Sequence, residues 1–209
     1  MIRINELKLP LDEDEKELYR LAAKALKIGE RHIRELTICK KSVDCRKKDD
    51  IKFIFSVDVA LDIDEKRVAS KAGNRVSLSE KSVYTLPPVK RKSTLRPVIV
   101  GFGPAGMFAA LTLTEAGLSP IIIERGETVD ERTASVKSFW RTRVLNPESN
   151  VQFGEGGAGT FSDGKLNTGT KDERIFFVLQ TLCEHGAPEN ILFDAKPHVG
   201  TDKLPQTVR

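Results

Sequence analysis

Two patterns of apolar residues divide this chain into two halves. From residue 51 to residue 63 every second residue is apolar, which predicts a strand with one buried face. Residues 98–100 and 121–123 are instead unbroken apolar runs, which are typical of buried strands. A glycine turn and a helical stretch lie between these two runs. The second half therefore begins as a βαβ unit.

The first 88 residues predict a small α+β domain. Apolar residues alternate in the first strand and then recur at helical spacing after an acidic turn. The expected elements are a strand over 2–9, a helix over 12–28, strands over 36–45 and 51–63, a helix over 64–72 and a strand over 82–86. This β-α-β-β-α-β order is the ferredoxin-like pattern.

A basic segment flanked by prolines, residues 89–96, separates the two halves and lacks apolar periodicity, as a linker does. The charge also changes here, because residues 1–96 carry 23 Lys and Arg against 16 Asp and Glu, and the rest of the chain carries 11 against 14. We expect two domains, residues 1–88 and residues 97–209.

The glycines after residue 100 have the spacing of a dinucleotide-binding fingerprint. Gly101 permits a tight turn, Gly103 lets the backbone approach a pyrophosphate, and Gly106 lets the following helix lie close to the sheet. Pro104 and Ala105 open that helix, whose N-terminus favours an anion.

An acidic residue completes the fingerprint, since Glu124 follows the second apolar run 23 residues after Gly101. A carboxylate there accepts both hydroxyls of an adenosine ribose and disfavours a 2′-phosphate. Arg125 and Arg132 are candidate phosphate contacts, with ordinary surface positions as the alternative. The motif predicts an adenine dinucleotide as the ligand.

A second glycine-rich segment, residues 154–166, is the other candidate site. It holds five glycines within eleven residues, yet Phe153, Phe161 and Leu166 anchor it, which argues against a flexible linker. Backbone N–H groups of such a loop can close on a flat polar ligand, and a positive charge near a reduced flavin would stabilise its anionic form. The candidate contacts are Gly156, Gly157, Gly159, Thr160 and Lys165. A surface loop with structural glycines is the alternative.

The remaining segments predict supporting elements. A helix over 128–144 is expected to turn Trp140 inward, the spacing of Thr170 and Glu173 is that of a capping box that opens a helix, and residues 191–194 are expected to form a strand.

Composition restricts the class of protein. The three histidines have no ligand spacing, so no metal site is expected, and the three cysteines are too few for a disulfide framework. No apolar run is long enough to span a bilayer, and the N-terminus lacks the apolar core of a signal peptide. We expect a cytoplasmic protein.

These motifs, above all the run Gly-Gly-Ala-Gly-Thr-Phe-Ser-Asp-Gly-Lys-Leu, resemble a bacterial family of uncharacterised FAD-dependent proteins labelled NAD(FAD)-utilising dehydrogenases. The resemblance covers most of residues 95–205 and, more loosely, the N-terminal domain. It implies that Gly101, Gly103, Gly106 and Glu124 bind the ADP half of FAD, and that Gly156, Gly157, Gly159 and Thr160 lie near the isoalloxazine and ribityl end. It assigns no catalytic residue. Family members are longer, so the resemblance also implies an N-terminal fragment with an incomplete Rossmann-type FAD/NAD(P)-binding domain, inactive on its own.

The expected function is that of an FAD-binding oxidoreductase that transfers electrons or hydride, with NAD(P)H as a candidate donor and an unspecified small-molecule substrate. An FAD monooxygenase is one alternative. The other is an RNA- or protein-binding module with a structural or sensing flavin, suggested by the basic N-terminal domain. A solvated basic face is the simpler interpretation of those charges, because no aromatic residues interleave with them.

Overall fold

The chain forms two compact units, each with its own sheet. The computed structural model describes residues 1–80, 84–90 and 94–209. The first unit comprises Met1–Val83 and Asn190–Pro197, and the second comprises Tyr84–Glu189 and His198–Arg209.

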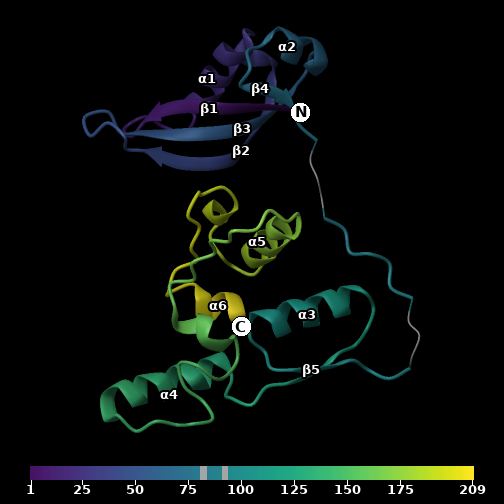
Figure 1. Cartoon of the computed structure of the whole chain (residues 1–209), viewed down its shortest axis with the longest axis vertical. Helices are drawn as coiled ribbons and strands as arrows, with labels where there is room; N and C mark the ends of the chain where they lie inside the picture. The colour runs from purple at the N-terminus through teal and green to yellow at the C-terminus, as the bar shows by residue number, and fades with distance from the viewer. Residues whose placement is uncertain (81–83, 91–93) are drawn as a thin grey trace. The chain divides into compact units, whose positions relative to one another are not determined.

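The first unit is an antiparallel sheet with two helices on one face (Figure 1). Its elements in chain order are β1 (Ile2–Pro10), α1 (Glu17–Leu26), η1 (Glu30–His32), β2 (Ile33–Asp44), β3 (Lys52–Leu61), α2 (Glu65–Lys71) and β4 (Val76–Leu78). The strand order is β2-β3-β1-β4. Val57 of β3 pairs with Ile4 of β1 on one side and with Ile38 of β2 on the other.

The alternation in β3 buries one face of this sheet beneath α1, whose own apolar residues recur at helical spacing. Fully or almost fully buried side chains make up this core: Ile2, Ile4, Leu9, Leu18, Ala22, Leu26, Phe55, Val57 and Val59. The sequence pattern therefore placed the core of this unit correctly.

The last strand of the first unit lies earlier than the sequence pattern indicated. β4 pairs Val76 with Ile4 and Leu78 with Ile2. The strand expected over 82–86 is wrong for residues 84–86, which have no strand conformation, and residues 82 and 83 lie outside the described residues. Three residues show too little alternation for β4 to be found from sequence.

A segment from late in the chain joins the edge of this unit at β2. The Lys41 N–H donates to the Phe193 carbonyl at 2.7 Å, and the Ala195 N–H donates to the Lys41 carbonyl at 2.8 Å. The strand expected over 191–194 is replaced by a 3₁₀ turn, η3 (Glu189–Leu192), followed by a single bridge between Asp194 and Lys41.

The second unit contains a parallel two-stranded sheet and four helices among its described residues. Its elements in chain order are β5 (Val98–Val100), α3 (Pro104–Glu115), β6 (Ile121–Ile123), α4 (Val129–Thr142), η2 (Gly157–Phe161), α5 (Arg174–Glu184) and α6 (Leu204–Val208). Val98 pairs with Ile121 and Val100 with Ile123 in parallel, and α3 runs alongside β5 (Figure 1). The expected order of strand, turn, helix and strand is therefore present.

Two parts of the second unit are more exposed than their apolar sequence predicted. Val100 is 84% exposed and Ile123 54%. Within the described residues β5 and β6 form a sheet of only two strands, and one whose faces are covered too little to bury these side chains. Trp140, expected to point inward, is 55% exposed: α4 buries Val129 and Val136, and Trp140 continues that stripe near the exposed end of the helix.

Helix starts in the second unit also differ from expectation. Thr170 and Glu173 form no capping box. The side chain that bonds the backbone at the start of α5 is Asp172, whose carboxylate accepts from the Arg174 N–H at 2.9 Å. The capping arrangement occurs at α4 instead, where the Glu131 carboxylate accepts from the N–H of Thr128 at 3.4 Å and from its hydroxyl at 2.9 Å.

Within the part of the chain that the structure describes, no helix combines the length and the apolar character needed to cross a membrane.

The core of the first unit gives a stability prediction. Phe55→Ala should lower the free energy of unfolding of this unit by about 3–5 kcal/mol, because it empties a fully buried position in the centre of the sheet. Val43→Ala, at a side chain that is 57% exposed on β2, is the control and should change it by less than about 1 kcal/mol. Amide hydrogen exchange of β1 and β3, followed against urea concentration, measures the stability of both variants. Equal losses of stability in Phe55→Ala and Val43→Ala would contradict the assignment of this core.

Candidate functional site

A cavity of about 540 Å³ lies between the fingerprint turn and the glycine-rich loop. Its walls include Gly101, Gly103, Glu124 and Arg125 from the βαβ unit, and Phe153 and Gly157 from the loop. Five of these residues were singled out from the sequence as candidate contacts, so two separate motifs meet at one opening.

The three fingerprint glycines differ in what surrounds them. Gly101 has a φ of +94°, a conformation that favours glycine. A Cβ on Gly106 would lie 2.1 Å from the Gly101 carbonyl oxygen, so α3 can approach the turn only without a side chain there. At Gly103 the nearest atom to a Cβ would be the Gly157 Cα at 3.9 Å, which is ordinary contact. The fold therefore favours glycine at Gly101 and Gly106 but has room for a Cβ at Gly103.

Helix α3 starts directly after this turn. Pro104 and Ala105 occupy its first positions, and the Met107 N–H makes the first helical bond, to the Gly103 carbonyl at 2.9 Å. The N–H groups before Met107 therefore have no intrahelical acceptor, and the positive end of the helix dipole lies next to Gly103.

The Glu124 carboxylate holds the turn from the other side. One oxygen accepts from the Phe102 N–H at 2.6 Å, and the other accepts from the Gly126 N–H at 2.9 Å. Burial raises the pKa of Glu124, but hydrogen bonds from the backbone of Gly126, Phe102 and Arg125, together with the charge of Arg132, outweigh it, and the net pKa lies below its usual value. Glu124 is therefore an ionised acceptor on the wall of the cavity.

The glycine loop contacts the fingerprint turn backbone to backbone. The Gly156 N–H donates to the Phe102 carbonyl at 2.8 Å. A Cβ on Gly157 would lie 3.2 Å from the Gly103 Cα, and one on Gly126 would lie 2.4 Å from the Gly154 Cα. The absence of side chains at these positions lets the loop close against the turn.

Arg132, expected to contact a phosphate, is fully buried beneath the loop. Its guanidinium donates to the carbonyls of Asn150, Val151 and Glu155 at 2.8, 2.9 and 2.7 Å. It also lies over the Phe161 ring, 5.0 Å from the ring centre. The fork of the guanidinium is used by backbone carbonyls of the loop, and Arg132 itself does not line the cavity.

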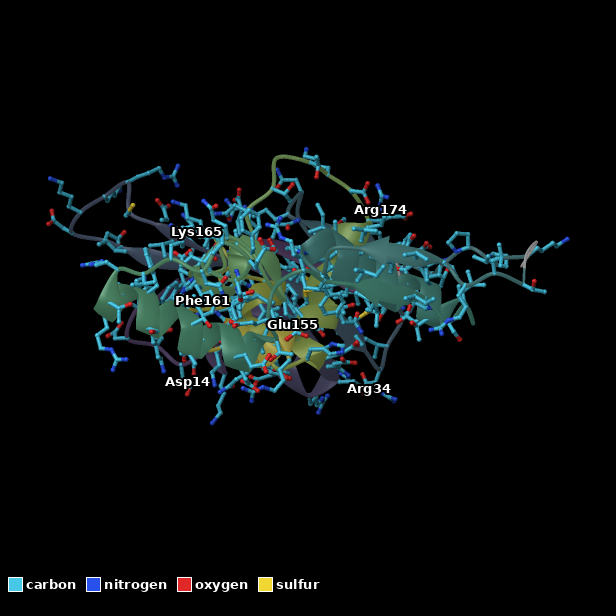
Figure 2. The ribbon with its side chains drawn as sticks, turned by 90° about the horizontal axis from the view of Figure 1, so that it is seen from below. Asp14, Arg34, Glu155, Phe161, Lys165 and Arg174 are labelled. Carbon is cyan, nitrogen blue, oxygen red and sulfur yellow. The ribbon has the colours of Figure 1, made fainter. Side chains whose placement is uncertain are left out.

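The remaining loop candidates are separated. Thr160 is 1% exposed and its hydroxyl donates to the Glu155 carbonyl at 3.1 Å, inside the loop. Lys165 is exposed and pairs with Asp163 at 3.2 Å, and a Cβ on Gly159 would meet open space. Figure 2 labels Glu155, Phe161 and Lys165 of this loop. The structure gives Thr160 and Lys165 intramolecular partners instead of a place on the cavity wall.

Phe153 is a wall residue whose role in the site the sequence did not reveal. The Arg125 guanidinium stacks over its ring, 4.4 Å from the ring centre, and pairs with Glu148 at 3.4 Å. Both stacked side chains are exposed and line the cavity. Sequence reasoning identified Phe153 only as an apolar anchor, and an aromatic residue directly before a glycine run was the available signal.

Comparison with known proteins points to the same segment. Residues 96–140 match a family described as an FAD binding domain, and residues 1–60 match a family described as a domain of unknown function (DUF8436). The first match spans β5, the fingerprint turn, α3, β6 and most of α4. The match of residues 96–140 supports, in coarse terms, a relationship to FAD-binding proteins.

Two relatives extend this comparison. An uncharacterised protein of Clostridium beijerinckii is 49% identical over 210 residues, which cover 100% of this chain and 39% of that protein. The dual trans-enoyl reductase/FAD-dependent monooxygenase tazHJ of Aspergillus terreus is 40% identical over 65 residues, 29% of this chain and 9% of that protein. The chain therefore spans well under half the length of either relative.

The Glu124 hydrogen bonds give a prediction of pH dependence. Because the pKa of Glu124 is lowered by folding, its stabilisation is complete above the unfolded pKa of about 4.3 and is lost as the pH falls through the folded pKa. Glu124→Gln should lower the free energy of unfolding at pH 7 by about 1–2 kcal/mol. It should also reduce the loss of stability on acidification from roughly pH 5 to pH 3, a range that brackets the unfolded pKa of glutamate. Calorimetric melting temperatures across this range measure it.

Glu115→Gln, at an exposed carboxylate at the end of α3, is the matched control. A Glu124→Gln variant with the same acid sensitivity as Glu115→Gln would show that the clamp on the turn contributes no net stability.

Proposed function

We propose that this chain contains the ADP-binding part of an FAD-dependent oxidoreductase. The observation that carries the proposal is the cavity at Gly103, a position where the fold itself has room for a side chain. The α3 N-terminus favours the charge of a pyrophosphate there, and the ionised Glu124 on the same wall can accept ribose hydroxyls. The match of residues 96–140 to an FAD binding domain supports the choice of flavin dinucleotide.

We also propose a fold type for each of the two domains. A Rossmann-type arrangement of residues 97–209 is supported by the parallel pairing of β5 with β6 across α3. A ferredoxin-like arrangement of residues 1–88 is supported by the sheet order β2-β3-β1-β4 with α1 and α2 on one face. The segment 89–96 is then the linker, and a cytoplasmic location is the corresponding proposal for the whole protein.

The remaining candidate contacts are assigned by this proposal as well. Gly101, Gly106, Pro104 and Ala105 shape the turn and the helix start that receive the diphosphate. Arg125 would lie beside the nucleotide with Phe153, since both line the cavity. Gly156, Gly157, Gly159, Thr160 and Lys165 are proposed to approach the flavin end. A bound flavin would supply the electron transfer, and the chain would bind and orient it.

The type of reaction has two candidates. Transfer of electrons or hydride from NAD(P)H is the first, and monooxygenation is the second, favoured by the name of the Aspergillus relative, which describes an FAD-dependent monooxygenase. Anaerobic titration of the full-length protein with NADH and NADPH distinguishes them: bleaching of the flavin without an organic substrate supports the first. Reduction that requires such a substrate, with oxygen uptake matched to product, supports the second.

The first test is the identity of the bound cofactor. We expect the purified full-length protein to show flavin absorption and to release FAD on denaturation. Release of NAD, or of no dinucleotide together with no binding of added FAD, would contradict the proposal.

A second test uses the different surroundings of the fingerprint glycines. Gly103→Val should abolish FAD retention while leaving the melting temperature of the FAD-free protein within a few degrees, because a Cβ at this position would make only an ordinary contact, with the Gly157 Cα at 3.9 Å. Gly106→Ala should destabilise the protein itself, because its Cβ would overlap the Gly101 carbonyl. Gly169→Ala, where a Cβ meets open space, is the control. Normal FAD content in Gly103→Val would refute the placement of the diphosphate.

A further inference from the structure

Arg132 is a fully buried cation of the second unit. Within the described residues, its guanidinium donates to four backbone carbonyls and one hydroxyl, all on the loop of residues 150–160: Asn150, Val151, Gly154, Glu155 and the Thr160 side chain. Its side chain is 0% exposed. A buried group of this kind is retained only where its hydrogen bonds and its position compensate for lost hydration.

The carbonyls that accept from Arg132 belong to a segment that has little else to hold it in place. A loop with glycines at 154, 156, 157 and 159 has few side chains for apolar packing, and its backbone is free to adopt many conformations. The guanidinium ties together the carbonyls on either side of Gly154, which itself has a φ of +122°. A Cβ on Gly154 would lie 2.6 Å from the Arg132 Cδ, so the loop is wrapped closely around this one side chain.

The loop that Arg132 holds also forms part of the cavity. Gly156, two residues after Gly154, donates to the Phe102 carbonyl of the fingerprint turn, and Gly157 contacts Gly103. Phe153 and Gly154 are themselves wall residues. One wall of the cavity therefore consists of backbone whose course is set from behind by Arg132.

The charge of Arg132 has a separate consequence. Among the described residues its hydrogen-bond partners are neutral oxygens, so no carboxylate in direct contact cancels the charge. Its guanidinium donates to the carbonyl of Gly154, which is itself a wall residue, so the charge lies directly behind the cavity wall. The same charge contributes to keeping the pKa of Glu124, on that wall, below its usual value. In the interior such a field is screened less than in water and favours an anionic ligand over a neutral one.

From these observations we infer that Arg132 is a positioning residue of the dinucleotide site: it fixes the glycine loop as the second wall of the cavity and supplies, from behind that wall, positive potential that favours a diphosphate. This role rests on the proposed binding of FAD, and it differs from a direct salt bridge to phosphate because the backbone lies between the charge and the ligand.

The test compares Arg132→Met, which removes the charge and the donors, with Arg132→Lys, which keeps the charge and loses the planar fork. Arg141→Met, at an exposed arginine on the same helix, is the matched control. FAD, ADP and adenosine are the probes, and calorimetric titration of the full-length protein measures their affinities. Amide hydrogen exchange of residues 150–161 without ligand is recorded for each variant.

We expect Arg132→Met to bind FAD and ADP at least tenfold more weakly than the parent, and to bind adenosine with a smaller loss. Arg132→Lys should retain the parent's ratio of ADP to adenosine affinity. Its affinity for FAD and ADP should lie between that of the parent and that of Arg132→Met. Exchange should increase in residues 150–161 of Arg132→Met and stay unchanged in β1 and β3. Arg141→Met should match the parent throughout.

Two outcomes would overturn the inference. One is a folded Arg132→Met protein with parental loop exchange and parental ADP affinity. The other is a uniform rise in exchange across α3, α5 and the loop with equal losses for ADP and adenosine, which would make Arg132 a purely structural residue.

If Arg132→Met does not fold, Gly154→Ala replaces it. That substitution disturbs the same contact from the loop side while the charge remains, so it should weaken FAD and ADP without lowering the ratio of ADP to adenosine affinity. Unchanged FAD affinity and loop exchange in Gly154→Ala would overturn the positioning role. A parent protein that binds none of the three probes would refute the proposed function, while the exchange comparison would still decide whether Arg132 orders the loop.

Discussion

Close backbone contact between two glycine-rich segments is the constraint on which the candidate site depends. The Gly156 N–H of the loop donates to the Phe102 carbonyl of the fingerprint turn, and a Cβ on Gly157 would lie 3.2 Å from the Gly103 Cα. The loop also meets the backbone at Gly126 at a separation that leaves no room for a Cβ. Segments without side chains cannot hold one another by apolar packing. Polar side chains from neighbouring elements therefore have to bond the backbone groups of these segments directly, and the shape of the cavity follows from where those side chains lie.

Three charged side chains meet this requirement in complementary ways. Glu124 accepts from N–H groups on both sides of the turn, and Glu155 accepts from the Val129 N–H at 2.6 Å where α4 begins. Arg132, one turn into the same helix, donates to the carbonyls of the loop that carries Glu155. The loop and α4 thus stabilise each other, with carboxylates on N–H groups and a guanidinium on carbonyls, so buried backbone polarity is satisfied without regular secondary structure.

Sequence reasoning succeeded where a pattern repeats and failed where a contact is unique. The alternation of β3 and the glycine spacing around Gly103 predicted the core of the first unit and the order of elements in the second. The hydrogen bonds from Arg132 to the loop were not predicted, because a bond from a side chain to a distant carbonyl leaves no periodic signal in the sequence. The exposure of Val100 was missed for a related reason: an apolar run predicts a strand, but its burial depends on which segments cover it.

The contrast between Gly103 and Gly106 is the strongest indication that a ligand binds at the fingerprint turn. Both belong to one motif, yet only Gly106 is demanded by the fold, because its Cβ would overlap a carbonyl of the preceding turn. Gly103 has extended backbone, which any residue adopts, and its Cβ position faces little besides Gly157. A glycine that the chain does not need for its own packing, placed on a cavity wall next to a helix N-terminus, is explained by something that approaches from outside the chain. The proposed diphosphate, in contact with the backbone at Gly103, would meet that condition.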